Sequence, residues 1–274
     1  MKKNYALIML AAVCMVACSN GKKTNTEEPK TRTLVLYYSQ TGATQRVAEE
    51  IGKQLGADVV ALELEQPYDG TFEQTIERCQ KEKADGVLPT LKKLDLNMDE
   101  YDVVFLGFPV WFGTYATPIA ALLKDQTFEG KKLVPFCTFG SGGLQECTEH
   151  LRKALPKAEV ADGYGIRNAR LKAVEKEVER FLVERGYKEG EVEALPAFME
   201  HHPVTEAETK IFDLACGDYQ FPLGTPIDVA VRETSNSTDY EYTVKSKNFA
   251  GEEVNTTIYV TVEKVADAKP EFTQ

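Results

Sequence analysis

A short loop rich in hydroxyl groups, Ser39–Thr44, lies between an apolar run and a helix-patterned stretch. A helix N-terminus leaves backbone N–H groups unpaired and carries partial positive charge, so a strand, this turn and a helix can together hold an anion. Gly42 would let the backbone approach the ligand closely. Because the loop has no lysine and no triphosphate-binding motif, it favours a single phosphate monoester. The loop is also compatible with hydroxyls that only cap the helix.

Two further segments carry residues that suit a flat ligand. Gly107–Thr114 contains Trp111, the only tryptophan, beside Phe112 in a turn rich in Pro and Gly. A flat aromatic ligand would use the face of the indole, although the indole could instead pack as a satellite of the core. Thr138–Gly143 is rich in glycine, so its N–H groups could reach ring heteroatoms, and Phe139 could cover the other face. A plain flexible turn would have the same composition.

The elements that must position these segments alternate between strand and helix patterns over residues 33–185, which predicts a doubly wound α/β fold with a parallel sheet. The expected strands are 33–38, 58–64, 103–106, 132–138 and 159–166, and the expected helices are 42–55, 72–83, 118–124, 144–155 and 169–185. Pro135 is awkward inside a strand unless a bulge accommodates it. In such sheets ligands bind beyond the carboxyl ends of the strands. Because all three segments leave such ends, we expect them to converge on one site.

The remainder of the chain changes character after residue 185. Residues 186–204 combine Gly, Pro and many charges and are predicted to form a linker. Residues 205–274 read as a short helix followed by β-type runs, with a hairpin around 235–238. The sequence therefore predicts a small, mostly antiparallel α+β domain at the C-terminal end.

The N-terminal residues are predicted to direct the chain to the cell envelope. Residues 1–17 have the charges and the short apolar stretch of a signal peptide. They end in a sequence that resembles a bacterial lipobox, so we expect cleavage before Cys18 and lipidation of that cysteine; an ordinary cleaved secretory signal is the alternative. Residues 18–32 are polar and would form a tether. The expected location is a lipid-anchored periplasmic or outer-membrane lipoprotein of a bacterium, with membrane contact only through the anchor.

The charge of the chain argues against a nucleic-acid partner. Its formal net charge is −11, and it becomes −13 when residues 1–17, with Lys2 and Lys3, are removed. Such a surface repels a phosphate backbone. It would favour basic protein partners, although solubility alone also explains it.

The cysteines and histidines indicate no metal site. The cysteines beyond the signal and anchor match no zinc spacing, and Cys137, at the end of an apolar run, is expected to be a buried free thiol. In an oxidising compartment the others could pair. Exposure is the simplest explanation for each of the three histidines. These residues are Cys79, Cys147 and Cys216, and His150, His201 and His202.

Taken together, the three segments resemble the flavodoxin family, and their Pro-Val-Trp and Cys-Thr elements resemble a bacterial flavodoxin-like subfamily. The resemblance rests on Tyr38–Thr44, Gly107–Gly113 and Phe136–Gly143 and covers about residues 33–185. It implies bound FMN, a five-stranded parallel sheet in the order 2-1-3-4-5, and transfer of one or two electrons. The C-terminal residues 205–274 have no counterpart in simple flavodoxins.

The resemblance also implies the residues that would contact FMN. It assigns the phosphate to Ser39, Gln40, Thr41, Gly42, Ala43 and Thr44. It assigns ring stacking to Trp111, surrounded by Pro109, Val110, Phe112, Gly113 and Thr114, and the ring edge to Thr138, Phe139, Gly140, Ser141 and Gly142. Three positions depart from the family pattern: Ala43 replaces a frequent Asn, Phe112 a frequent Trp or Tyr, and Phe139 a small residue.

Three functions are compatible with these features. The first is an FMN-dependent electron carrier or small reductase, whose partner is a redox protein or a small electron acceptor. FMN would carry the redox chemistry, so no catalytic side chain is required. The second is a non-catalytic envelope lipoprotein whose C-terminal domain binds a partner and whose flavin site is vestigial. The third is a phosphate or nucleotide sensor that does not use the Trp111 platform.

Overall fold

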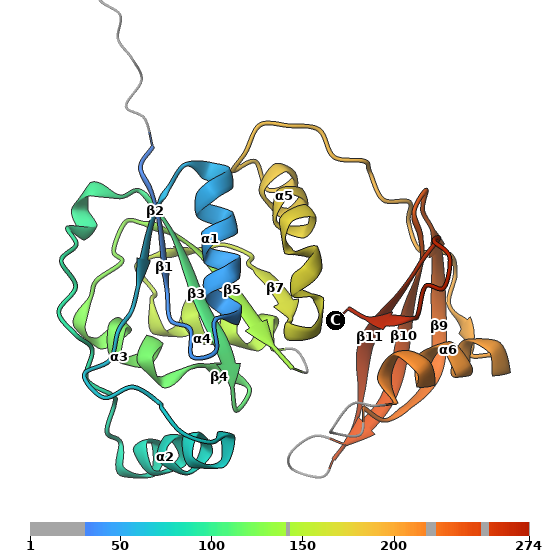
Figure 1. The fold of residues 1–274 in the computed structure, drawn as a ribbon, viewed down its shortest axis with the longest axis horizontal. Helices are drawn as coiled ribbons and strands as arrows, with labels where there is room; N and C mark the ends of the chain where they lie inside the picture. The colour runs from blue at the N-terminus through green and yellow to red at the C-terminus, as the bar shows by residue number, and fades with distance from the viewer. Residues whose placement is uncertain (1–30, 141–142, 218–222, 248–251, 274) are drawn as a thin grey trace, which may run out of the picture. The chain divides into compact units, whose positions relative to one another are not determined.

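The N-terminal part of the chain is a parallel sheet with helices on both faces (Figure 1). The structure, a computed structural model, describes residues 31–140, 143–217, 223–247 and 252–273. The strand order is β2 (Asp58–Ala61), β1 (Thr33–Tyr37), β3 (Val103–Trp111), β5 (Lys132–Phe139), with β6 (Glu159–Val160) and β7 (Tyr164–Arg167) sharing the last position. The short strand β4 pairs only with β3 and lies outside this order, so β5 is the fourth parallel strand and β6 with β7 is the fifth. The predicted order 2-1-3-4-5 and the flavodoxin-like fold class are therefore confirmed.

Alternate residues of the central strands point into two hydrophobic cores, one on each face of the sheet. On one face Val35 and Phe105 pack with Val47 and Ile51 of α1. On the other face Leu36, like Leu106 of β3, packs with residues of α3 and α4. The helices of the first face are α1 (Ala43–Leu55) and α5 (Val174–Glu184), and those of the second are α3 (Thr117–Asp125) and α4 (Leu144–Ala154). The sheet is therefore buried on both sides, as near-continuous apolar strands require.

The helix α2 (Phe72–Asp85) lies away from both faces, at the end of the sheet toward which β1 and β3 run (Figure 1). A capping box begins it, in which the Thr71 side chain accepts from the Gln74 amide and the Gln74 side chain accepts from the Thr71 amide. Its position brings α2 next to the carboxyl edge where the three predicted loops meet. A short 3₁₀ helix, η1 (Met98–Glu100), precedes β3.

The largest correction to the predicted elements concerns the segment 107–114, which is not a loop. The strand β3 continues to Trp111, and β4 (Thr114–Tyr115) pairs back onto it, with Val110 opposite Tyr115 and Trp111 opposite Thr114. Pairing along both sides keeps the chain extended past the apolar run 103–106. The segment is a β-hairpin, which is a more rigid support than a loop.

Smaller differences follow from local chemistry. Predicted strand 58–64 ends at Ala61, predicted strand 159–166 is split into β6 and β7, and predicted helix 169–185 begins with a 3₁₀ turn, η2 (Asn168–Ala173). The carbonyls of Lys131 and Leu133 accept hydrogen bonds from the β6 side, so Pro135, two residues on, faces the same edge. Its missing N–H therefore lies at the gap between β6 and β7, which explains why proline is tolerated there.

The C-terminal part is an antiparallel sheet covered on one face by a helix. The sheet order is β12 (Glu271–Phe272), β11 (Glu253–Glu263), β10 (Ser237–Lys247), β9 (Thr225–Glu233) and β8 (His202–Pro203). The helix α6 (Glu206–Cys216) packs Phe212 on Tyr242, with ring centroids 5.2 Å apart. This arrangement confirms the predicted antiparallel sheet. The strand β8 lies inside the predicted linker, and β12 had no signal in the sequence.

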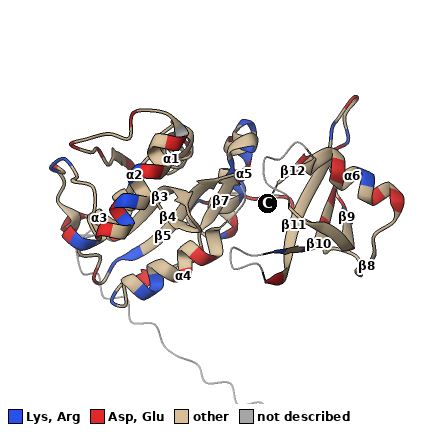
Figure 2. Ribbon diagram, turned by 90° about the horizontal axis from the view of Figure 1, so that it is seen from below, with Lys and Arg blue, Asp and Glu red and all other residues tan. Residues whose placement is uncertain are grey.

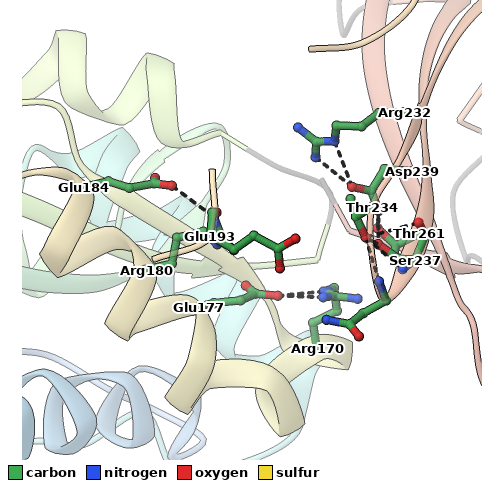
Figure 3. A network of polar contacts seen from close by, with 11 residues as sticks. Arg170, Glu177, Arg180, Glu184, Glu193, Arg232, Thr234, Ser237, Asp239 and Thr261 are labelled. Atoms are coloured by element: carbon green, nitrogen blue, oxygen red, sulfur yellow. Dashed lines mark hydrogen bonds and ion pairs between the residues drawn. The ribbon is translucent and has the colours of Figure 1, made fainter. Parts of the chain in front are cut away.

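The turn between β9 and β10 is stabilised by a buried carboxylate. Asp239 is 8% exposed, and its Oδ2 accepts from Arg232 Nε at 2.9 Å and from another Arg232 nitrogen at 2.8 Å. Its Oδ1 accepts from the hydroxyls of Ser237 and Thr261, each at 3.0 Å (Figure 3). A buried charge is costly unless it is paired in this way. The hairpin predicted around residues 235–238 is therefore present and locked.

A pH-dependent contact joins the chain before β8 to the outer face of this sheet. His201 Nδ1 faces Asp228 Oδ1 of β9 at 2.5 Å, and Nε2 faces Glu241 Oε1 of β10 at 3.0 Å; Tyr259 of β11 in turn bonds to Glu241. The hydrogen bonds to Asp228 and Glu241 raise the pKa of His201 above its usual value. Both ring nitrogens can donate only in the imidazolium form.

We expect this contact to stabilise the fold at low pH. The folded-state pKa of His201 is higher than the unfolded one, so its contribution is complete below the unfolded pKa and is lost as pH rises through the folded pKa. Denaturant unfolding at pH 5.5 and 8.5 should show His201→Gln losing more stability at the lower pH. An equal loss at both pH values would contradict the assignment, and His150→Gln, on α4, is the matched control.

The cysteines of the described residues form no disulfide. Cys79, Cys137, Cys147 and Cys216 are all buried free thiols, which confirms the prediction for Cys137. Burial raises the pKa of Cys147 to about 12, so this thiol is unreactive at neutral pH.

Acidic and basic residues are spread over the helices of both parts (Figure 2). In the described part, no helix is sufficiently long and apolar to cross a membrane.

Candidate functional site

The three predicted segments meet at the carboxyl edge of β1, β3 and β5. The hydroxyls of Thr44 and Thr138 are 2.9 Å apart, and both residues are buried. The Tyr38 amide, at the start of the first segment, donates to the Gly107 carbonyl at 3.0 Å. A Cβ at Gly143 would lie 2.9 Å from Val110. The expected convergence is therefore present; Ser141 and Gly142 lie outside the described residues.

The bond between Thr44 and Thr138 is the direct link between the first and third segments. We expect Thr44→Val to destabilise the protein by about 1–3 kcal/mol, because a buried hydroxyl then loses its partner. The double variant Thr44→Val/Thr138→Val should recover part of this loss, since both partners are then apolar. Chemical denaturation of the wild type, Thr44→Val, Thr138→Val and the double variant measures the coupling free energy between the two hydroxyls. Additive losses would show that the two hydroxyls do not act as a pair.

The N-terminus of α1 has neither a side-chain cap nor an acidic residue in its first turn. The capping position is Gly42, with φ 88° and ψ −9°, a left-handed conformation that favours glycine. Its amide donates to Ser39 Oγ at 3.1 Å. By contrast, α2 and α6 each have a capping box and at least one acidic residue in the first turn, whereas α3 also lacks both but has a proline in its first turn. The Ser39 hydroxyl thus binds the amide of the capping residue of α1, whereas no N-cap side chain binds the amides of the first turn, so the positive end of this helix is open to an anion.

The Gln40 side chain turns away from the loop toward α2. Its Nε2 donates to the Tyr68 carbonyl at 3.2 Å and to Thr75 Oγ1 at 2.9 Å. The backbone of Gln40 is therefore the part that remains for a phosphate. Beside it, a hollow of about 210 Å³ is small against the roughly 300–1,000 Å³ typical of ligand pockets, so it would not hold a flavin ring by itself. Its lining is Tyr38, Ser39, Gln40, Leu62, Glu63, Leu64, Pro67, Tyr68 and Lys92.

The two aromatic side chains of the Trp111 hairpin, Trp111 and Phe112, differ in how far they are exposed to solvent. The Trp111 indole is half-buried and makes edge-to-face contacts with Tyr38 at 5.8 Å and Tyr68 at 5.1 Å, both at 83°. Phe112 is 45% exposed at the tip, and the Lys83 Nζ of α2 lies 5.3 Å from its ring centroid. The indole is therefore held by core residues and still borders the site. The satellite-core and platform interpretations of Trp111 are compatible.

The tip of the hairpin is strained. Phe112 and Gly113 form a two-residue turn with φ of 52° and 73°, the signature of a type I′ turn, which favours Asn-Gly. A bulky residue in the left-handed region costs of order 1–3 kcal/mol. Phe112→Asn should therefore raise the free energy of unfolding by about 1 kcal/mol, measured by chemical denaturation. A loss of stability would show that contacts of Phe112, such as that with Lys83, outweigh the strain.

Phe139 is a core residue. It is 4% exposed, and a Cβ at Gly165 would come within 2.7 Å of its ring. The ring therefore does not lie on the open side of the site, where the sequence suggested that it could cover a ligand. A small residue at 165 provides the space for the bulky residue at 139, which the sequence around 139 alone could not show.

Sequence reasoning missed three side chains near the site. Tyr68 and Lys83 reach the Trp111 hairpin from the segment that contains α2. His150 Nδ1 and Thr114 Oγ1 lie 2.9 Å apart, which joins the hairpin to α4. Tyr68 follows an irregular stretch and carries no periodic signal, so only the tertiary structure shows its role.

A parallel sheet in this order, with an uncapped helix N-terminus and an aromatic hairpin at its carboxyl edge, defines a flavodoxin-like protein. The chain belongs to the flavodoxin family (Flavodoxin_4), which matches residues 32–181. Among curated proteins, none matches the chain.

Three similar solved structures each cover a little over half of the chain. A protein described as a flavoprotein from Bacteroides eggerthii DSM 20697 is 29% identical, covers 56% of this chain and 96% of its own, and has a TM-score of 0.49. A second, from Bacteroides uniformis ATCC 8492, is 24% identical over 54% of this chain and 98% of its own, with a TM-score of 0.49. A flavoprotein in complex with FMN from Lactobacillus acidophilus NCFM is 24% identical over the same shares, with a TM-score of 0.45.

Proposed function

We propose that this protein binds FMN at the carboxyl edge of its parallel sheet and transfers electrons, as a carrier or as a small FMN-dependent reductase of the bacterial cell envelope. The observation that carries the proposal is the N-terminus of α1, left without a cap or an acidic residue beside the Trp111 hairpin. Membership of the flavodoxin family and the FMN complex of the Lactobacillus flavoprotein support the choice of ligand.

The donor set at the first segment fits a phosphate monoester. Thr41 and Gly42 are exposed, and the first-turn amides of α1 have no intrahelical partner. A dianionic phosphate is favoured near such an end by up to about 2 kcal/mol when partly buried. The residues that would hold it are Ser39, Gln40 through its backbone, Thr41, Gly42, Ala43 and Thr44.

The flavin ring would lie between the Trp111 hairpin and the third segment. FMN, when bound, supplies the one- and two-electron chemistry. Trp111 would provide the stacking surface, and the third segment, with Thr138 and Gly140, would provide the ring-edge contacts. An electron-rich indole and an acidic protein disfavour added negative charge on the ring, whereas the Lys83 ammonium, 5.3 Å from the Phe112 ring, acts in the opposite direction. These side chains would bind the flavin and adjust its reduction potential, and none of them needs to move a proton.

The envelope location completes the proposal. It rests on the signal sequence and on Cys18 as the lipidated residue, both of which lie outside the described residues. An anchored domain on a polar tether could reach a redox partner protein or a small electron acceptor. The antiparallel C-terminal sheet is an additional surface for such a partner.

The test is a visible absorption spectrum of the purified protein from Ser19 onward, with and without added FMN. Bound flavin should absorb at ~450 nm and remain with the protein through gel filtration. A colourless protein that takes up no added FMN would contradict the proposal and favour a vestigial site. Binding of inorganic phosphate without flavin would favour an anion sensor.

A further inference from the structure

Tyr68 occupies the centre of a cluster that reaches both the phosphate segment and the aromatic hairpin. It is 7% exposed and lies just before α2. Its ring contacts Trp111 at 5.1 Å and Tyr38 at 6.4 Å, both edge-to-face. Its carbonyl accepts from the Gln40 side chain at 3.2 Å. One residue therefore contacts two of the three segments of the site.

The ring of Tyr68 is fixed by charged and polar groups of neighbouring helices. The Arg78 guanidinium of α2 lies 4.0 Å from the ring centroid. The Tyr68 hydroxyl donates to Glu82 Oε2, and Thr117 Oγ1 of α3 lies 2.7 Å from the same hydroxyl. Arg78 Nε donates to Glu82 Oε1 at 2.9 Å, which closes the network. Each partner is itself held, so the orientation of the Tyr68 ring is set from several sides.

The loop that carries Tyr68 is tied down independently. Arg78 also donates to the carbonyls of Gln66 and Pro67, at 3.0 and 2.8 Å. These bonds leave the backbone around Tyr68 little freedom to move away from Trp111. Edge-to-face aromatic pairs add roughly 0.5–1.5 kcal/mol beyond burial, and their strength depends on geometry. A fixed Tyr68 therefore fixes the plane of the Trp111 indole.

We propose that Tyr68 is a positioning residue for the flavin platform: it holds the Trp111 indole in the orientation that a bound flavin needs, and Glu82 and Arg78 of α2 hold Tyr68. This inference rests on the proposed function, because the Trp111 indole is a flavin platform only if the protein binds FMN. The contact between the Tyr68 and Trp111 rings is present without FMN. Holding Tyr68 gives α2 a role beyond the Cys79 side chain that this helix contributes to the core, because α2 then also supports the site.

The chain offers a closely matched control. Tyr101 is also 7% exposed, donates to a carboxylate (Asp58, 2.7 Å) and has an arginine over its ring (Arg32, 4.8 Å). Among the described residues, no ring contact joins Tyr101 to Trp111, and Tyr101 lies before β3, at the opposite end of that strand from the hairpin. Tyr68→Leu and Tyr101→Leu thus remove similar interactions, and only the first removes a contact with Trp111.

The experiment uses Trp111 as the single fluorophore of its kind in the chain. In flavin-free protein, Tyr68→Leu should at least double the acrylamide quenching constant of Trp111, and Tyr101→Leu should leave it unchanged. Affinities for FMN and for riboflavin should both fall by the same factor, roughly three- to tenfold, because the lost contact supports the ring and not the phosphate. If Tyr68→Leu does not fold, Tyr68→Phe, which keeps the ring and loses the bond to Glu82, should raise quenching by a smaller amount.

Two sets of results separate this inference from the proposed function. Trp111 quenching or flavin affinity in the Tyr68 variant equal to that in Tyr101→Leu would overturn the positioning role, even if FMN binds. A wild-type protein that takes up no flavin would refute the proposed function, and the quenching comparison would then decide the positioning role alone.

Discussion

Trp111→Ala is expected to weaken FMN binding by about 10- to 100-fold and to leave the affinity for inorganic phosphate unchanged. Stacking of a flat base on an aromatic side chain contributes roughly 1–3 kcal/mol, and 1.4 kcal/mol corresponds to a factor of ten. In the proposed site the phosphate is bound at the start of α1, whose amides do not depend on the indole. Titration of the variant with FMN, riboflavin and phosphate, followed by flavin fluorescence or calorimetry, gives the three affinities.

Trp111→Ala must be compared with a variant that keeps an aromatic ring at position 111. Trp111→Phe retains a smaller stacking surface on the same hairpin and should lose less than Trp111→Ala. Removing the indole also removes its contacts with Tyr38 and Tyr68, so the stability of each variant has to be measured by denaturation. Little change in flavin affinity for Trp111→Ala would show that the indole is only a core residue, and would favour an anion sensor over a flavoprotein.

The alternation of apolar runs and helix patterns was sufficient to predict the fold class, a parallel sheet with helices on both faces. Parallel strands buried on both faces are almost continuously apolar, as in 34–37 and 103–106, and each predicted helix of the α/β part is present. The strand order followed from the resemblance to a family. Strands that depend on pairing rather than composition were missed: β4 and β12 have two residues each and exist because a longer strand lies beside them.

The site was predictable where its chemistry is local, and not where it depends on packing. The candidate phosphate segment, Ser39–Thr44, is recognisable in the sequence because a strand pattern, a hydroxyl-rich turn and a helix pattern follow one another there. The orientation of Gln40 toward α2, the burial of Phe139 against Gly165, and the approach of Tyr68 to Trp111 each depend on a residue at least 26 positions away. Such contacts leave no local periodic signal, and the strained φ of Phe112 arises from the hairpin that β4 completes.

Ala43→Glu is expected to have opposite effects on stability and on FMN binding. Ala43 is the first residue of α1, in a helix whose first turn lacks an acidic residue. A carboxylate there complements the helix dipole and should stabilise the protein by about 0.3–1 kcal/mol. The same carboxylate would repel the phosphate of FMN, and juxtaposed like charges cost several kcal/mol. We therefore expect FMN affinity to fall by about 100-fold or more while the melting temperature rises.

The comparison with riboflavin makes this test specific to the phosphate. Riboflavin has the same ring and no phosphate, so Ala43→Glu should leave its affinity unchanged. Ala43→Gln has nearly the same shape without the charge, so it isolates the electrostatic effect from steric crowding at the half-buried position. Raising the salt concentration should recover part of the lost FMN affinity, because ions screen the repulsion. Equal losses for FMN and riboflavin would place the phosphate elsewhere, whereas a loss confined to FMN with a more stable protein would assign the open end of α1 to the phosphate.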